Sequence, residues 1–176
     1  GLGAATLTDI FFFRFLKDSR ISQEESEVLS TLSEFIWFAL CFIVLTGIAL
    51  YIPEANHYNE VPKFLAKILI VGVIIVNGAF LNLYIAPRLV KISFGEPHHH
   101  KKGELVLARR LAFALGPISI VSWYSAFILG SLPASTPLAF STFLKIYILL
   151  IVMAVTLGQF AEHRLSKTPL PWTEPS

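Results

Sequence analysis

The chain has 176 residues, of which 55% are hydrophobic and 15% are charged, and its net charge is +2 at pH 7. Soluble domains carry about 25% charged residues, and here the apolar residues form long blocks rather than stripes. The composition therefore excludes a single soluble domain and predicts a polytopic membrane protein of the all-α class. The small net charge gives no indication of nucleic-acid binding, and the basic residues lie at the ends of the apolar blocks.

Five apolar blocks predict five transmembrane helices in one bundle. The first block, residues 1–17, is short for a helix that crosses a bilayer, so we expect further residues before Gly1. The second helix begins at a capping box, Ser22 with Glu25, and its apolar part covers about residues 32–52. The remaining spans are predicted at about 64–86, 107–130 and 139–163, which makes residues 1–163 the bundle and residues 164–176 a Pro-rich tail.

The third block, residues 61–91, organises the rest of the chain. It is apolar over the roughly 20 residues that a membrane helix needs, and prolines mark its two ends. Lys67, Asn77 and Asn82 fall within one arc of roughly 140° on this helix. Polar groups in hydrocarbon need partners, so this face is expected to point at the other helices.

Two single residues inside the spans carry further predictions. Pro117 lies within the fourth span, where it should kink the helix and release a backbone carbonyl near Phe113. Cys41 is the only cysteine, so it cannot form a disulfide within the chain, and it is interpreted as a small buried hydrophobic residue.

Lysine and arginine residues set the predicted orientation. With five spans, the basic residues of the first connection, the third connection and the C-terminus all fall on one side, which is expected to be the cytoplasm. The C-terminal tail is then cytoplasmic, and we expect the membrane to be the bacterial inner membrane. The aromatic residues fit two interfacial belts, an outer one of Tyr51, Tyr58, Trp123, Tyr124 and Tyr147 and an inner one of Trp37 and Tyr84.

Asp9, Asn77, Asn82 and Lys67 are the candidate site inside the membrane. Asp9 and Asn77 come out at similar depth, each about 10 Å from the cytoplasmic boundary at 1.5 Å per residue. An Asp at that depth must be paired or protonated, which makes it a functional candidate. The alternative is a hydrogen bond between Asp9 and Asn77 that only locks the first and third helices together. Lys67 lies nearer the outer boundary, where it either snorkels to the interface or contacts a buried anion or substrate.

His98, His99 and His100 form a second candidate site, in the polar connection after the third span. Clustered neutral imidazoles bind copper or zinc, so a metal site is one interpretation. The other is a solvated polar loop, because three consecutive residues fix no coordination geometry. The sequence contains no Walker A motif, no HExxH and no nucleophile elbow, and we expect no enzymatic activity.

A first helix with small residues, a span ending in LTGIALYI and the third-block sequence KFLAKILIVGVIIVNGAFLNLYIAPRL cover about the first half of the chain. Together these stretches resemble the CopD-type copper-resistance membrane proteins and their uncharacterised bacterial inner-membrane relatives. The resemblance implies an all-helical bundle and copper handling. It assigns no copper-binding role to a residue, because Met153 and Cys41 are the only sulfur-containing side chains and form no series of soft ligands.

Two functions remain open. The first is an accessory or structural subunit that packs against other membrane proteins or against itself, which the short loops, the small-residue faces and the 15 Phe residues favour. The second is a small transporter or an ion- or metal-handling protein of CopD-like type that uses Asp9 and Asn77. A water-filled cavity at Asp9 would favour the second function, and a dry, packed interior would favour the first.

Overall fold

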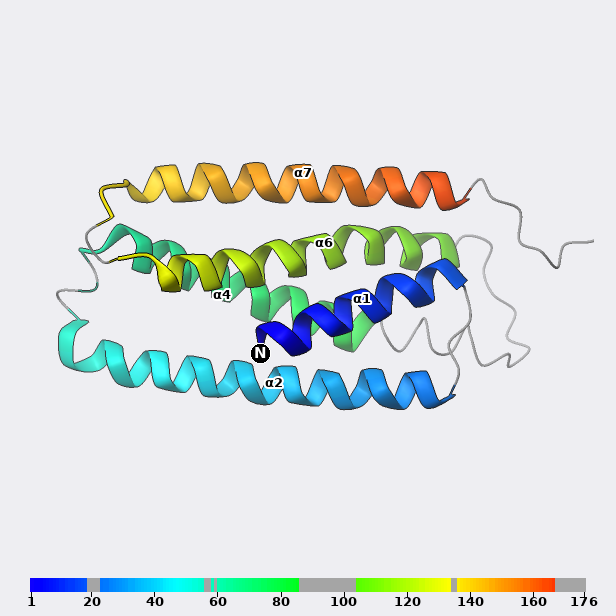
Figure 1. Ribbon diagram of the computed structural model, residues 1–176, viewed down its shortest axis with the longest axis horizontal. Coiled ribbons are helices and arrows are strands. Elements are labelled where there is room, and N and C mark those ends of the chain that lie inside the picture. The colour runs from blue at the N-terminus through cyan, green and yellow to red at the C-terminus, as the bar shows by residue number, and fades with distance from the viewer. Residues whose placement is uncertain (19–22, 56–57, 59, 86–103, 134–135, 167–176) are drawn as a thin grey trace, which may run out of the picture.

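The computed structural model describes residues 1–18, 23–55, 58, 60–85, 104–133 and 136–166. Within these residues every regular element is a helix, so the predicted all-α bundle is confirmed. The 3-10 turn η1 continues α2, and the π-helical segment η2 continues α4 (Figure 1). The elements are α1 (Leu2–Asp18), α2 (Gln23–Tyr51), η1 (Ile52–Glu54), α4 (Pro62–Phe80), η2 (Leu81–Ile85), α6 (Glu104–Ser131) and α7 (Phe140–Ser166).

Four of the described helices are long and apolar enough to cross a membrane, as expected for a membrane-spanning protein. Helix α1 has 17 residues, fewer than any of these four spans, and within it Leu2–Phe11 is an apolar stretch. All five predicted blocks are helices, and four of them qualify as membrane spans among the described residues, whereas the first is the shorter helix α1, for which a full crossing stays a prediction. The four spans are Ser30–Glu54, Pro62–Ile85, Arg110–Ser131 and Phe140–Arg164.

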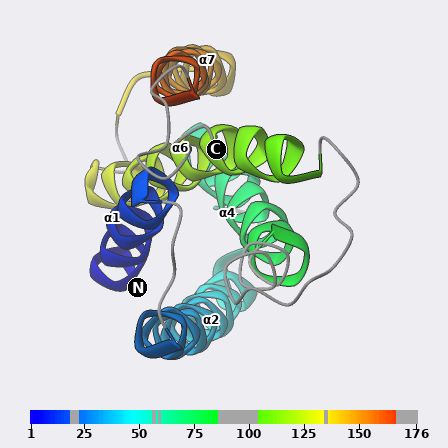
Figure 2. The ribbon, with the colours of Figure 1, turned by 90° about the vertical axis from the view of Figure 1, so that its right-hand side faces the viewer.

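Helix α6 lies at the centre of the bundle. It packs against α7, α4 and α1, whereas α2 packs mainly against α1. In the view along the bundle, α2 and α7 lie on opposite sides of the group formed by α1, α4 and α6 (Figure 2). Helix α1 begins near the middle of the bundle's length and runs towards the end at which α6 begins and α7 finishes (Figure 1). The short helix α1 is thus the main link between α2 and the rest of the molecule.

The largest buried apolar cluster takes residues from all five α-helices. The prediction that Trp123 and Tyr147 belong to an outer aromatic belt is wrong, because their exposed fractions are only 8% and 6%. The Trp123 ring packs beside Gly1, and the Tyr147 hydroxyl lies 2.8 Å from Ser122 Oγ inside the bundle. The members of the cluster are Ala5, Leu40, Ile70, Ile74, Trp123 and Tyr147.

Helix α4 departs from a regular α-helix where it packs against α6. Helix α4 passes into the π-helical η2, and Ile85 of η2 packs in a second buried cluster with Ala112 of α6. Pro117 lies inside α6, one turn further on, as predicted. Membrane helices tolerate such irregular turns where neighbouring helices and polar side chains satisfy the freed backbone groups. This part of the α4–α6 contact is therefore where polar side chains are expected.

Candidate functional site

Asp9 of α1 and Asn77 of α4 are both buried in the bundle, each with an exposed fraction of 6%. The Asp9 carboxyl accepts a hydrogen bond from the Ser119 hydroxyl, and Asn77 Nδ2 donates to the Leu115 carbonyl oxygen at 3.1 Å. Leu115 and Ser119 are four residues apart on α6, so they share one face and lie about 6 Å apart along the helix axis. Helix α6 therefore holds both polar side chains within about one turn. We call Asp9, Asn77, Leu115 and Ser119 the polar centre.

The predicted hydrogen bond from the Asn77 amide to the Asp9 carboxyl is not among the contacts of the polar centre: Asn77 Nδ2 donates to Leu115 and the Asp9 carboxyl accepts from Ser119. Two buried acceptor atoms, Asp9 Oδ2 and Asn77 Oδ1, have no hydrogen-bond partner among the described residues. A buried acceptor without a partner costs about 1–3 kcal/mol, and native structures contain few of them. The polar centre contains two such unpartnered acceptor atoms, which makes it the strongest candidate site in the described part of the chain.

Pro117 lies between the two residues of α6 that hold the centre. A proline has no N–H to donate to the carbonyl four residues earlier, which is that of Phe113. Gly158 of α7 packs directly against this place: a Cβ at position 158 would overlap the Phe113 carbonyl oxygen and would lie 2.9 Å from Pro117 Cγ. Glycine therefore allows the α7 backbone to approach α6 more closely than any other residue would.

Lys67 lies away from the polar centre. It precedes Asn77 by ten residues, which is about 15 Å along α4. Its Nζ lies 3.2 Å from the position that a Cβ of Gly130 would take, and Lys63 Nζ, one turn earlier, donates to the Leu132 carbonyl. The last carbonyls of a helix lack partners within the helix, so positive charge at this end of α6 is favourable. Both lysines thus support the C-terminal end of α6.

The remaining predicted site residues are placed only in part. Asn82 lies in η2 and is half-buried. His98, His99 and His100 lie outside the described residues, so copper or zinc binding by this loop stays a prediction. Among the residues that the structure does describe, no group of three or more His, Cys, Asp or Glu side chains is placed to hold a metal ion.

Further polar contacts join α6 to α7. Ser122 Oγ donates to the Ile118 carbonyl and bonds to the Tyr147 hydroxyl, and Gln159 Nε2 donates to the Arg110 carbonyl at 3.0 Å. These contacts tie α7 to α6 on both sides of Gly158. They give α7 a polar attachment along most of its packed face, in addition to its apolar contacts.

Reasoning from the sequence missed three parts of the site: the Leu115 carbonyl, Ser119 and Gly158. A backbone carbonyl has no sequence signal of its own. Ser119 carries a weak one, because it is a hydroxyl residue two positions after a proline inside a membrane helix. Gly158 carries a weak one as well, since a lone glycine in an apolar span indicates close helix approach.

None of the family models, curated proteins and solved structures compared with this chain matches it. The assignment of the site therefore depends on the burial and the hydrogen bonds of its own residues.

Proposed function

We propose that this protein is an accessory or structural membrane subunit, and that it docks against a transmembrane helix of another membrane protein through α2. The observation that supports this is the exposure of α2: only 6% of its most apolar stretch is buried, against 39% for α6. From residue 41 to residue 50, every side chain except that of Val44 is exposed, which means exposure around the whole circumference of the helix. Leu40 is the only buried residue in the described part of α2.

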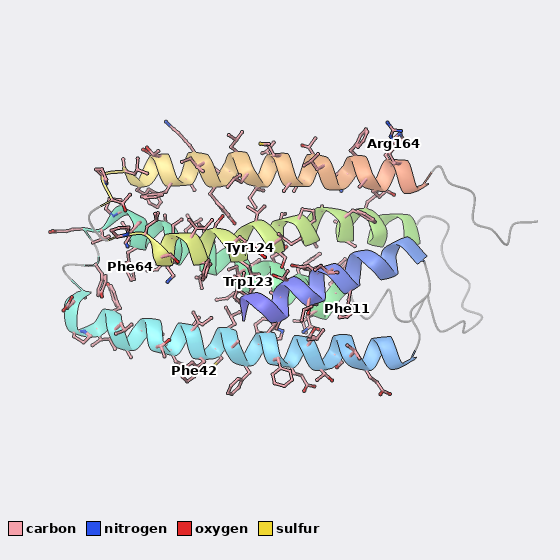
Figure 3. All side chains as sticks on the ribbon, viewed as in Figure 1. Phe11, Phe42, Phe64, Trp123, Tyr124 and Arg164 are labelled. Carbon is pink, nitrogen blue, oxygen red and sulfur yellow. The ribbon has the colours of Figure 1, made fainter. Side chains whose placement is uncertain are left out.

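The outward face of α2 carries large rings. Phe35, Phe38 and Phe42 have exposed fractions of 63%, 73% and 62%, and Phe42 points away from the other helices in Figure 3. Helices associate in a membrane through close van der Waals packing, because lipid tails are as apolar as the side chains themselves. A phenylalanine face with no neighbour in its own bundle offers a large packing area to a helix of a partner.

The test is photocrosslinking in native membranes. A benzophenone amino acid at Phe38 or Phe42 should give an adduct of discrete mass that contains another membrane protein. The matched controls are Leu149 and Leu157 of α7, which are 59% and 67% exposed and should crosslink to lipid only. Lipid adducts alone from all four positions would contradict the proposal. An adduct of twice the chain's mass, together with an oxidised Cys41–Cys41 dimer, would identify the partner as a second copy of this chain.

Ion handling is the second candidate function, and the two unpartnered acceptor atoms of the polar centre favour it. If the carboxyl carries protons or cations, Asp9→Asn should leave the fold intact and abolish a flux that depends on pH or on an ion gradient in proteoliposomes. Equal flux through the wild type and the variant would contradict this function. The CopD-like resemblance, with its implied copper handling, remains a prediction beside it.

We further propose that the end of the bundle that carries most of the basic residues faces the cytoplasm of a bacterial inner membrane, with the C-terminus on that side. Helix α6 begins and α7 ends at the same end of the bundle, where Arg164 lies (Figure 3). Positive charge concentrates on the cytoplasmic side of membrane proteins. In a Cys41→Ser background, cysteines at His99 and Ser166 should be labelled from the cytoplasm only and one at Asn56 from outside only. Labelling of position 99 from outside would reverse the orientation.

A further inference from the structure

We propose that the polar centre is a binding site for one exchangeable proton, which is carried by Asp9 Oδ2 and donated to Asn77 Oδ1. This inference goes beyond the docking role of α2 and does not depend on it. Its basis is that each side chain has one end fixed to α6 and one buried oxygen without a partner among the described residues.

The number of missing hydrogens indicates a single proton. An ionised carboxylate oxygen and an amide oxygen can only accept hydrogen bonds, so neither can satisfy the other. One proton on Asp9 Oδ2 makes that oxygen a donor and supplies the hydrogen that Asn77 Oδ1 lacks. One O–H bond forms on Asp9 as one O–H bond of a hydronium ion breaks and leaves a water molecule, and the centre goes from one negative charge to none. The proton comes from water and returns to it.

A metal ion fits this centre less well than a proton. Hard cations take about six or more oxygen ligands, whereas the polar centre offers two unpartnered acceptors. The other oxygens near them, the Ser119 hydroxyl and the Leu115 carbonyl, already take part in hydrogen bonds. An ionised carboxylate in a membrane bundle requires a compensating positive charge, and a neutral acid does not.

No positive side chain among the described residues forms an ion pair with Asp9, whose one described polar contact is Ser119. Helix α1, which carries Asp9, packs against α2 and α6. Helix α4 contributes Asn77 to the polar centre, and α7 packs beside the centre at Gly158. Glu162 is the only charged residue on these four helices that is as deeply buried as Asp9 in the described part of the chain. The described titratable residues there are Glu27, Glu34, Cys41 and Tyr51 on α2; Lys63 and Lys67 on α4; Arg110 and Tyr124 on α6; and Lys145, Tyr147, Glu162, His163 and Arg164 on α7.

The chain is suited to a direct test, because Asp9 and Asp18 are its only aspartates. The protein is labelled with ¹³C at the aspartate carboxyl and reconstituted in lipid, and isotope-edited infrared spectra are recorded at neutral pH. The wild type should show the C=O band of a protonated carboxylic acid. Asp18→Asn should keep this band and Asp9→Asn should lose it. In D₂O the band should move to lower frequency, because the proton exchanges.

A second variant tests the acceptor. Asn77→Ala should move the C=O band of Asp9 to higher frequency, because the acid loses the oxygen to which it donates. Asn82→Ala is the matched control, since it removes a half-buried asparagine from the same membrane span and should leave the band in place.

Two results would overturn the inference: carboxylate bands alone from Asp9 at neutral pH, or a protonated band that does not respond to D₂O. An Asn77→Ala spectrum identical to that of the wild type would remove Asn77 as the acceptor. The isotope label reports on the unaltered chain, so the test stands even where a variant does not fold. It also requires no ion flux, so its outcome is separate from that of the transport assay.

Discussion

Helices α2 and α6 are both long and apolar, yet one is exposed almost throughout and the other is the most enclosed span in the described structure, with 6% and 39% of their most apolar stretches buried. Helix α6 contains Pro117 and the hydroxyl residues Ser119, Ser122 and Ser125, whereas the exposed half of α2 consists mainly of large apolar side chains. Lipid solvates apolar side chains as well as protein does, so hydrophobicity alone does not draw membrane helices together. Small and polar residues decide which helix becomes the centre.

The largest effect is expected where two backbones meet. Gly158→Ala places a methyl group against the Phe113 carbonyl and Pro117, so it should lower the free energy of unfolding by about 1–3 kcal/mol. Thermal unfolding in detergent would measure this loss. Gly72→Ala is the matched control, because the space around Gly72 in α4 is open and alanine favours the helix. Equal stability of the two variants would show that α7 does not depend on close approach at position 158.

A smaller loss is expected at the polar centre itself. Asp9→Leu removes the contact with Ser119 and should cost about 1–2 kcal/mol of unfolding free energy, whereas Asp9→Asn can still hydrogen-bond and should keep most of the stability. Measuring the free energy of unfolding of both variants under the same conditions would separate the contribution of side-chain packing at position 9 from that of its hydrogen bond. If the leucine variant proved as stable as the wild type, Asp9 would contribute nothing to the fold, and its burial would need an explanation in function alone.

The contact between Ser122 and Tyr147 offers a finer measurement. Tyr147→Phe and Ser122→Ala each remove one partner of a buried 2.8 Å hydrogen bond, and such bonds in membrane proteins average about 0.6 kcal/mol. A double-mutant cycle gives the coupling energy of the pair. A coupling near zero would mean that each group finds another partner, such as the Ile118 carbonyl that Ser122 already reaches.

The smallest effect is expected on α2. Phe38 is 73% exposed, so Phe38→Ala should change the free energy of unfolding of the isolated protein by less than about 0.5 kcal/mol. The same change should weaken crosslinking to a partner in native membranes if α2 is the docking helix. A large loss of stability in the isolated protein would instead make α2 an integral part of the bundle and would remove the contrast with α6.

Helix positions followed well from the sequence, because long apolar runs and their flanking prolines are signals that depend only on local composition. The inward face of Asn77 followed too, since a polar group in hydrocarbon needs a partner. Counting residues gave the depth of a side chain along its helix axis, but it did not give the neighbouring helix towards which the side chain points. That is why Asp9 and Asn77 could be set at one level, while their partners on α6 could not be identified.

The burial of aromatic residues and of the cysteine was harder to predict. Trp123 and Tyr147 were expected at an interface and are buried, while Cys41 was expected inside and is exposed. In the helix of a soluble protein an apolar stripe marks the buried face. A membrane helix is apolar on all faces, so its sequence does not indicate which face is buried. Only contacts between helices decide which of two similar faces is enclosed.

The π-helical segment η2 (Leu81–Ile85) has a consequence for insertions and deletions in α4. A π-turn closes its hydrogen bond over five residues instead of four, so it accommodates one residue more than an α-turn. Removing a single residue within residues 81–83 would restore an ordinary α-turn and keep Ile85 on the side of the helix that packs against α6. The same deletion within Pro62–Phe80 would rotate everything after it by about 100° and carry the packed side chains away from α6. Along α4, the tolerance for a change in length is therefore concentrated in η2.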